Sequence, residues 1–171
     1  MKINRASLVK AMLLSSLALL CLPSCYTLSG IAIDPNTKTF NVVLFENNSL
    51  NVVPTLATDF TEALKNKIRS ESRLNLRTVD PDIEFSGAIT KYAVTAEAPE
   101  PGETVSFNRL TMTVKVDFKN YNDEDNVWSK TFEFFDNFES NENLISIQDG
   151  LIETLNENLV DQIFNHAFTN W

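Results

Sequence analysis

The sequence contains few of the residues that catalytic and metal-binding sites require, with one histidine, two cysteines and four glycines among 171 residues. Any Ser–His–Asp triad would have to use His166, and the chain has neither a GxSxG nor an HExxH motif. His166 falls in the last turn of a predicted C-terminal helix, where a positive charge complements the helix dipole, so we interpret it as a surface or capping residue. The glycines are too scattered for a phosphate-binding loop. The sequence therefore predicts a protein that is not an enzyme and that uses no cofactor.

Acidic side chains form two groups, and neither has the spacing of a metal or catalytic site. Residues 123–125 (DED) are consecutive and lack the spacing of an EF-hand loop, which favours a solvated hairpin tip. A second group recurs every four residues along the predicted C-terminal helix: Asp149, Glu153, Glu157 and Asp161. We interpret it as an exposed stripe, because paired glycosidase carboxylates face each other across a cleft. No metal site is predicted.

Residues 1–24 have the features of a secretory signal peptide. Three basic residues among the first ten precede an apolar stretch, residues 11–22, that is too short for a membrane-spanning helix. The stretch ends in the tetrapeptide LPSC, which resembles a lipobox and ends at Cys25. We expect cleavage before Cys25 and acylation of this cysteine, palmitate included. The alternative is an ordinary signal peptide followed by a chance cysteine.

The expected mature chain, residues 25–171, has the size of one domain and a strongly acidic balance. Cys21 would leave with the signal peptide and Cys25 would be acylated, so no thiol remains for a disulfide or a zinc site. Three of the 14 basic residues lie in the signal peptide, which leaves 11 against 23 acidic residues and a net charge of −12. This charge argues against nucleic acid as a partner and against general adhesion to anionic lipid. We therefore expect the acyl chains to attach the protein to a membrane.

Apolar periodicity in the mature sequence predicts two helices and a group of strands. Four-residue spacing from Leu56 to Ile68 predicts a first helix that ends near Ser70. A second stripe, from Ile147 to Ile163, predicts a C-terminal helix with a capping box at Ser146 and Asp149. Strands are predicted at residues 39–45, 74–79, 83–96, 110–119 and 127–135.

Details of the strands place them in one sheet. Apolar residues on both faces of residues 39–45 indicate an interior strand, and a change of phase near Lys91 indicates a bulge. Residues 110–119 alternate strictly, with Thr111 and Thr113 on the outward face. We predict an α+β fold, a two-layer α/β sandwich in which two helices pack on one face of a mainly antiparallel sheet of four to five strands. The other face should be wet or covered by a partner.

One short segment is basic although the mature chain is acidic. Five of its 11 basic residues lie within 13 positions: Lys65, Lys67, Arg69, Arg73 and Arg77. Such a group could bind phosphates or sugar carboxylates through charge-assisted hydrogen bonds. The alternative is a helix C-terminus complemented by cations. We treat the five residues, named here the basic segment, as a candidate anion-binding site.

Seven segments spread over the mature chain are informative: CYTLSG (25–30), FNVVLFEN (40–47), PTLATDFTEALK (54–65), RLNL (73–76), FSGAITKY (85–92), NRLTMTVKVDF (108–118) and NENLVDQIFNHAFTNW (156–171). With these segments the mature chain resembles, over its whole length, the LptE family, the lipoprotein partner in lipopolysaccharide assembly at the outer membrane. No single segment is diagnostic, and their order along the chain is what makes the resemblance specific.

The resemblance implies a noncatalytic plug inside the LptD β-barrel that assists barrel assembly and lipopolysaccharide transport to the cell surface. It also implies an outer-membrane location, with the lipid anchor on the periplasmic side. The basic residues through which enteric family members contact lipopolysaccharide cannot be matched to positions in this chain, so the role of the basic segment is our own inference from charge.

A second function class stays open, namely a free-standing periplasmic lipoprotein that binds glycan or another envelope component. Glycan binding would require exposed aromatic side chains in a cleft, whereas we interpret Trp128, Phe132, Phe134 and Phe135 as strand core.

Overall fold

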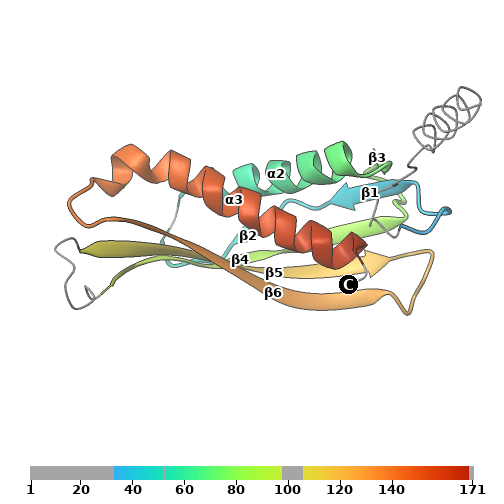
Figure 1. The fold of residues 1–171 in the computed structure, drawn as a ribbon. Helices are drawn as coiled ribbons and strands as arrows, with labels where there is room; N and C mark the ends of the chain where they lie inside the picture. The colour runs from blue at the N-terminus through green and yellow to red at the C-terminus, as the bar shows by residue number, and fades with distance from the viewer. Residues whose placement is uncertain (1–32, 52, 98–105, 170–171) are drawn as a thin grey trace, which may run out of the picture.

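The computed structural model describes residues 33–51, 53–97 and 106–169. In chain order the elements are β1 (Thr39–Val42), β2 (Glu46–Asn47), α2 (Leu56–Glu71), β3 (Asn75–Leu76), β4 (Ile83–Ala96), β5 (Phe107–Asn120), β6 (Val127–Glu139) and α3 (Leu144–Phe168). Both helices lie on one face of a single sheet, which confirms the predicted two-layer α+β sandwich (Figure 1). The predicted signal peptide and Cys25 lie outside the described residues, and so do residues 98–105 between β4 and β5.

The sheet has the strand order β3-β1-β4-β5-β6, and β2 pairs with β4 beside β1. Strands β4, β5 and β6 are long and antiparallel, but β1 is parallel to both β3 and β4, and β2 is parallel to β4. The sheet is therefore mixed. The parallel pairing of β1 with β3 follows from the connection between them, because helix α2 carries the chain back to the starting end of the sheet. As predicted, β1 is an interior strand.

The antiparallel strands follow the expected patterns closely. The register between β4 and β5 shifts between Ile89 and Lys91, which confirms the predicted bulge. The inward residues of β5 are fully or almost fully buried: Leu110, Met112, Val114, Val116 and Phe118. Thr111 and Thr113 are also buried, so the outward face of the sheet is partly covered by its own side chains. Thr111 lies between Ala93 of β4 and Phe135 of β6 in the register.

The two helices end close to their predicted positions. Helix α2 runs from Leu56 to Glu71 and buries the predicted apolar stripe against the sheet. Helix α3 begins earlier than predicted, at Leu144, and its N-cap is Asn143, whose side chain accepts a hydrogen bond from the Ile145 amide at 3.0 Å. The predicted capping box at Ser146 and Asp149 is therefore wrong, because these residues lie inside the helix. Among the described residues, neither helix is long and apolar enough to span a membrane.

The core lies between the helices and the inward face of the sheet. Aromatic rings make much of it: Phe45 packs edge-on against Phe60 of α2 with ring centroids 4.9 Å apart, and Phe85 of β4 packs against Phe118 at 5.0 Å. Phe168, at the end of α3, also packs against Phe85, with ring centroids 6.0 Å apart. Both described helices are therefore fixed to the same sheet face, and neither of them lies on the opposite face (Figure 1).

Candidate functional site

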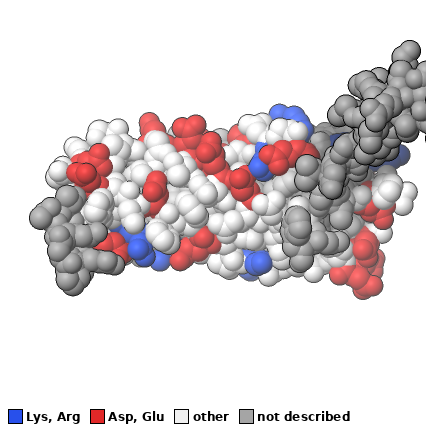
Figure 2. Space-filling view, viewed as in Figure 1, with Lys and Arg blue, Asp and Glu red and all other residues white. Residues whose placement is uncertain are grey.

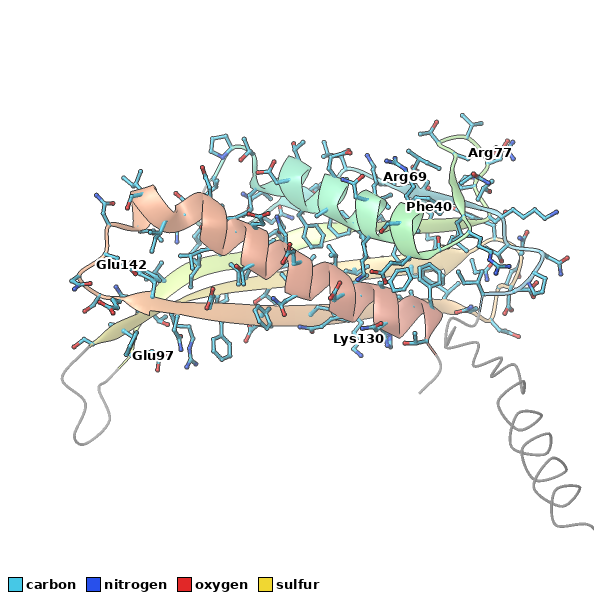
Figure 3. The ribbon with its side chains drawn as sticks, turned by 45° about the horizontal axis from the view of Figure 1, so that its top comes forward. Phe40, Arg69, Arg77, Glu97, Lys130 and Glu142 are labelled. Carbon is cyan, nitrogen blue, oxygen red and sulfur yellow. The ribbon has the colours of Figure 1, made fainter. Side chains whose placement is uncertain are left out.

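The basic segment lies along the C-terminal half of α2 and the connection that follows it, so the structure brings its residues to one end of the molecule. Figure 3 shows Arg69 and Arg77 at this end, and Glu97 and Glu142 at the other. The five residues of the basic segment do not have the same environment, however. Two lysines are engaged in ion pairs within the chain, and the three arginines are exposed.

Lys65 and Lys67 take part in ion pairs within the protein. Lys65 Nζ lies 2.8 Å from Glu62 Oε1, one helical turn away. Lys67 Nζ lies 2.6 Å from Glu71 of its own helix and 2.5 Å from Asp161 of α3, so it connects the two helices. Burial lowers the pKa of Lys67, but its hydrogen bonds to Asp161 and Glu71 outweigh burial and raise the pKa overall. These two lysines therefore serve the fold, and a ligand would have to compete with their carboxylate partners.

Arg69, Arg73 and Arg77 form no ion pair with any described residue. Arg69 Nη1 donates a 3.2 Å hydrogen bond to Asn66 Oδ1 and is otherwise exposed. Arg73 lines a surface hollow of about 540 Å³ between the start of β1 and the end of α2, together with Lys38, Asp34 and Glu71. Fewer basic side chains are thus available to an anion at this end of the molecule than the sequence suggests. The three arginines of the basic segment are exposed, whereas its two lysines are engaged in ion pairs.

The outward face of the sheet carries a polar network that sequence reasoning did not find. The guanidinium of Arg109 stacks over the Phe135 ring, 4.1 Å from its centroid, and Arg109 Nε lies 3.1 Å from Glu97 Oε1. Further along, Thr113 Oγ1 donates a 2.7 Å hydrogen bond to Glu133. The only available signal was the alternation of β5, which places Arg109 outward next to the inward Leu110, but its partners depend on the register of three strands.

The four aromatic residues of β6 that we interpreted as strand core divide between the two sheet faces. Phe132 is buried, and Trp128 is stacked on Phe118 with ring centroids 5.2 Å apart, as expected for strand core. Phe134 is partly buried against the same core. Phe135 faces outward and is 44% exposed, so its assignment to the core is wrong. Successive side chains of a strand point to opposite faces of the sheet, so Phe134 and Phe135 cannot both lie in the core.

His166 lies against the Trp128 ring at the end of α3, with ring centroids 4.7 Å apart. Its Nδ1 atom is 3.4 Å from Lys130 Nζ. Burial, and then the positive charge of Lys130, lower the pKa of His166. His166 is exposed, as predicted for a surface residue, although its surroundings lower its affinity for a proton. Its place in the last turn of the helix is as predicted.

Within the described part of the chain, no group of three or more His, Cys, Asp or Glu side chains is placed to hold a metal ion. What the geometry offers is surfaces: an arginine-rich end, a polar outward sheet face and an acidic surface over the helices. The crystal structure of a minor lipoprotein from Acinetobacter baumannii has the same fold, with a TM-score of 0.50, 12% identity, and coverage of 78% of this chain and 97% of that one.

The family follows from the sequence match. The LptE family model, whose description is lipopolysaccharide-assembly, matches residues 37–167, so the chain belongs to the LptE family. A second solved structure, the rare lipoprotein B from Shewanella oneidensis, is similar over 74% of this chain and 92% of that chain, with 12% identity and a TM-score of 0.47. No curated protein matches the chain in sequence.

Proposed function

We propose that this protein is the LptE-type accessory lipoprotein of an LptD β-barrel and acts, without catalysis, in lipopolysaccharide transport to the cell surface. The observation that carries the proposal is the family match over residues 37–167, which includes every described helix and strand in whole or nearly so. Residues 1–24 act as the signal peptide, and Cys25 carries the acyl chains that hold the protein in the outer membrane on its periplasmic side.

The outward sheet face is suited to the lumen of a barrel. Lumen walls of transmembrane barrels are polar, and this face presents charged and hydroxyl side chains, several of which are paired with one another. The face carries Lys91, Glu97, Arg109, Lys115, Asp117 and Glu133. A wall of this kind can exchange hydrogen bonds with polar lumen residues at little desolvation cost, because several of its charges are already paired with one another. We propose this face as the contact with the barrel.

The arginine-rich end is the proposed contact with lipopolysaccharide. Arg69, Arg73 and Arg77 are exposed and have no carboxylate partner among the described residues. Guanidinium groups form bidentate, charge-assisted hydrogen bonds with phosphates, which lipopolysaccharide carries. Lys65 and Lys67 belong to the same segment but are paired within the protein, so we assign them a supporting role.

The test of the function is depletion of this protein in its own cells, followed by measurement of lipopolysaccharide on the cell surface and of folded LptD in the outer membrane. Both should fall together, because the accessory protein is required to assemble the barrel. Recovery of the protein as a lone lipoprotein after mild detergent extraction, with normal surface lipopolysaccharide after depletion, would refute the proposal. Mass spectrometry of the native protein should find Cys25 as the acylated N-terminal residue.

A further inference from the structure

Strand β6 lies at one edge of the sheet, and its outer side pairs with no described strand. It is 13 residues long and contains neither proline nor glycine, whereas β3, at the opposite edge, has 2 residues. Short strands, proline and bulges are among the devices that keep a sheet edge from pairing with another chain. The described edge at β6 has none of these three, so it can accept a further strand.

The hydrogen bonds at the end of β6 show which of its backbone groups point away from the sheet. The Ser140 amide donates to the Ser106 carbonyl, just before β5, at 2.9 Å. Hydrogen-bonded pairs alternate along an antiparallel ladder, so even-numbered residues of β6 bond to β5 and odd-numbered residues turn their N–H and C=O outward. The Asn137 amide agrees with this direction, because it donates to Asp136 Oδ1 at 2.9 Å.

The odd-numbered residues of β6 divide into an occupied and an open group. The Asn137 amide is occupied by Asp136, and the Glu139 amide donates to Glu142 Oε2 at 3.2 Å. The other odd-numbered residues are all exposed, and on this side their backbone groups have no partner in the described part of the chain. We name them the open edge: Val127, Ser129, Thr131, Glu133 and Phe135.

The open edge is complementary to itself about Thr131, the residue at its centre. Its two large apolar side chains lie at its two ends, where Val127 is 53% exposed and Phe135 is 44% exposed. A second copy related by a two-fold axis at Thr131 would place Val127 opposite Phe135 and Ser129 opposite Glu133. Each exposed apolar side chain would then meet another, and cross-strand pairs of this kind stabilise a sheet.

Charge favours this register over the neighbouring ones. An axis at Lys130 or at Glu133 would place that residue opposite itself, and like charges directly opposite each other are destabilising. An axis at Phe132 would extend the pairing to Asn137, whose amide is already occupied. With the axis at Thr131, Lys130 lies opposite Phe132, and no charged residue of the open edge lies opposite another.

The helix layer is less suited to a second copy, because acidic side chains gather over the helices (Figure 2) and two such surfaces would repel each other. We propose that two copies of this protein pair antiparallel through their open edges and form one continuous sheet. The opposed odd-numbered residues exchange two hydrogen bonds per pair. The pairing is a property of the free lipoprotein and does not rest on the proposed function.

Cysteine cross-linking tests the register, because the expected mature chain has no free thiol. The Cα atoms of residues that face each other in a hydrogen-bonded pair are about 5.5 Å apart, which a disulfide can span. The mature lipoprotein with Thr131→Cys, oxidised in an excess of detergent micelles, should therefore form a disulfide-linked dimer. Ser129→Cys is the matched control on the same edge, since Ser129 would lie opposite Glu133 and not opposite itself. Equal dimer yields from the two variants, or no dimer from Thr131→Cys, would overturn the proposal.

Thr131→Pro tests the hydrogen bonds. It removes an amide that faces the open edge and takes no part in the ladder with β5, so the monomer should fold and keep its far-ultraviolet circular dichroism. Sedimentation in detergent should show dimerisation weakened by about tenfold or more, because both copies lose a hydrogen bond. A folded Thr131→Pro protein that dimerises as tightly as the wild type would overturn the proposal.

Thr131→Glu tests the two-fold axis by charge. Within one copy the new carboxylate lies opposite Lys115 of β5, which favours the fold, but between copies it lies opposite itself. The variant should therefore dimerise less than the wild type, and a mixture with Thr131→Lys should restore pairing between the two variants. A wild-type protein that stays monomeric, or that uses this edge only for a different protein, would overturn the proposal.

Discussion

The ring of Phe45 packs against the backbone of Gly87 in β4, at a place where a side chain has no room. A Cβ atom at position 87 would lie 2.9 Å from Phe45 Cε1 and would overlap the carbonyl oxygen of Lys115 on β5. The φ angle of Gly87 is +156°, a conformation that L-residues rarely adopt. Phe45 in turn contacts Phe60 of α2. The absence of a side chain at Gly87 therefore allows Phe45 to connect the helix layer with the sheet.

Gly87→Ala should lower the free energy of unfolding by about 1–3 kcal/mol, because the added methyl group forces a shift of the β5 backbone or of Phe45. Urea denaturation of the mature protein, followed by far-ultraviolet circular dichroism, measures the change. Gly150→Ala is the matched control, since a Cβ at Gly150 in α3 would have no atom within 4 Å. Alanine there should raise stability by up to about 1 kcal/mol. Equal effects of the two substitutions would contradict this account.

The elements of the fold were predictable because their patterns are local. Strict alternation identified β5, four-residue spacing identified both helices, and a change of phase located the bulge near Lys91. Strand direction was not predictable, because a period of two is the same in parallel and antiparallel strands. The burial of Thr111 and Thr113 also depended on neighbouring strands, which the alternation of β5 does not reveal.

Asp82 joins the beginnings of β1 and β4 and should make stability depend on pH. Its Oδ2 atom accepts hydrogen bonds from the Lys38 and Thr39 amides, both at 2.8 Å, and from Thr39 Oγ1 at 2.9 Å. The Lys38 amide is the main cause that lowers the pKa of Asp82 to about 2, from an ordinary value of 3.8. Because the folded state favours the ionised carboxylate, this contribution is complete above pH about 4 and is lost as the pH falls toward 2.

Asp82→Asn should therefore lower the urea midpoint at pH 7, and the difference from the wild type should shrink as the pH falls from about 4 toward 2. Asp80→Asn is a suitable control, because Asp80 is exposed in the turn that precedes β4. A difference at Asp82 that stays constant across this pH range would show that the carboxylate charge is unimportant there.

His166 should titrate below its ordinary pKa of 6.5 when followed by NMR. Burial against Trp128 is the main cause, and the charge of Lys130 adds to it. Lys130→Gln should therefore raise the pKa of His166 part of the way back, since it removes the second cause alone. Because the unfolded chain binds the proton more readily, stability should decrease as the pH falls from 6.5 through the folded pKa. If the pKa of His166 does not change in Lys130→Gln, the charge of Lys130 does not contribute to the lowered pKa.

The candidate site was less accessible to sequence reasoning than the fold. Charge counting found the basic segment but could not show that Lys67 is paired with Asp161, a residue 94 positions away in another element. The predicted acidic stripe of α3 is exposed, as expected, but its spacing could not show that Asp161 takes part in that ion pair or that the other three carboxylates lie beside α2. Both features come from the packing of α2 beside α3, which no pattern within a single helix specifies.

Arg69→Glu with Arg73→Glu should weaken binding of lipopolysaccharide by the purified lipoprotein by at least about tenfold, because each lost charge-assisted hydrogen bond contributes about 1.5–3 kcal/mol. Lys115→Glu with Lys119→Glu is the matched control, since it makes the same change of charge at exposed positions on the outward face of β5. The control should retain most of its affinity, because screening confines the effect of a surface charge to about 10 Å at 0.1 M salt. Thermal unfolding should change little in the arginine variant, because Arg69 and Arg73 form no ion pair with any described residue. The control loses only the exposed 3.8 Å pair between Lys115 and Asp117, which contributes little to stability. If the two double variants bind lipopolysaccharide equally, total charge governs the interaction and the arginine-rich end has no specific role.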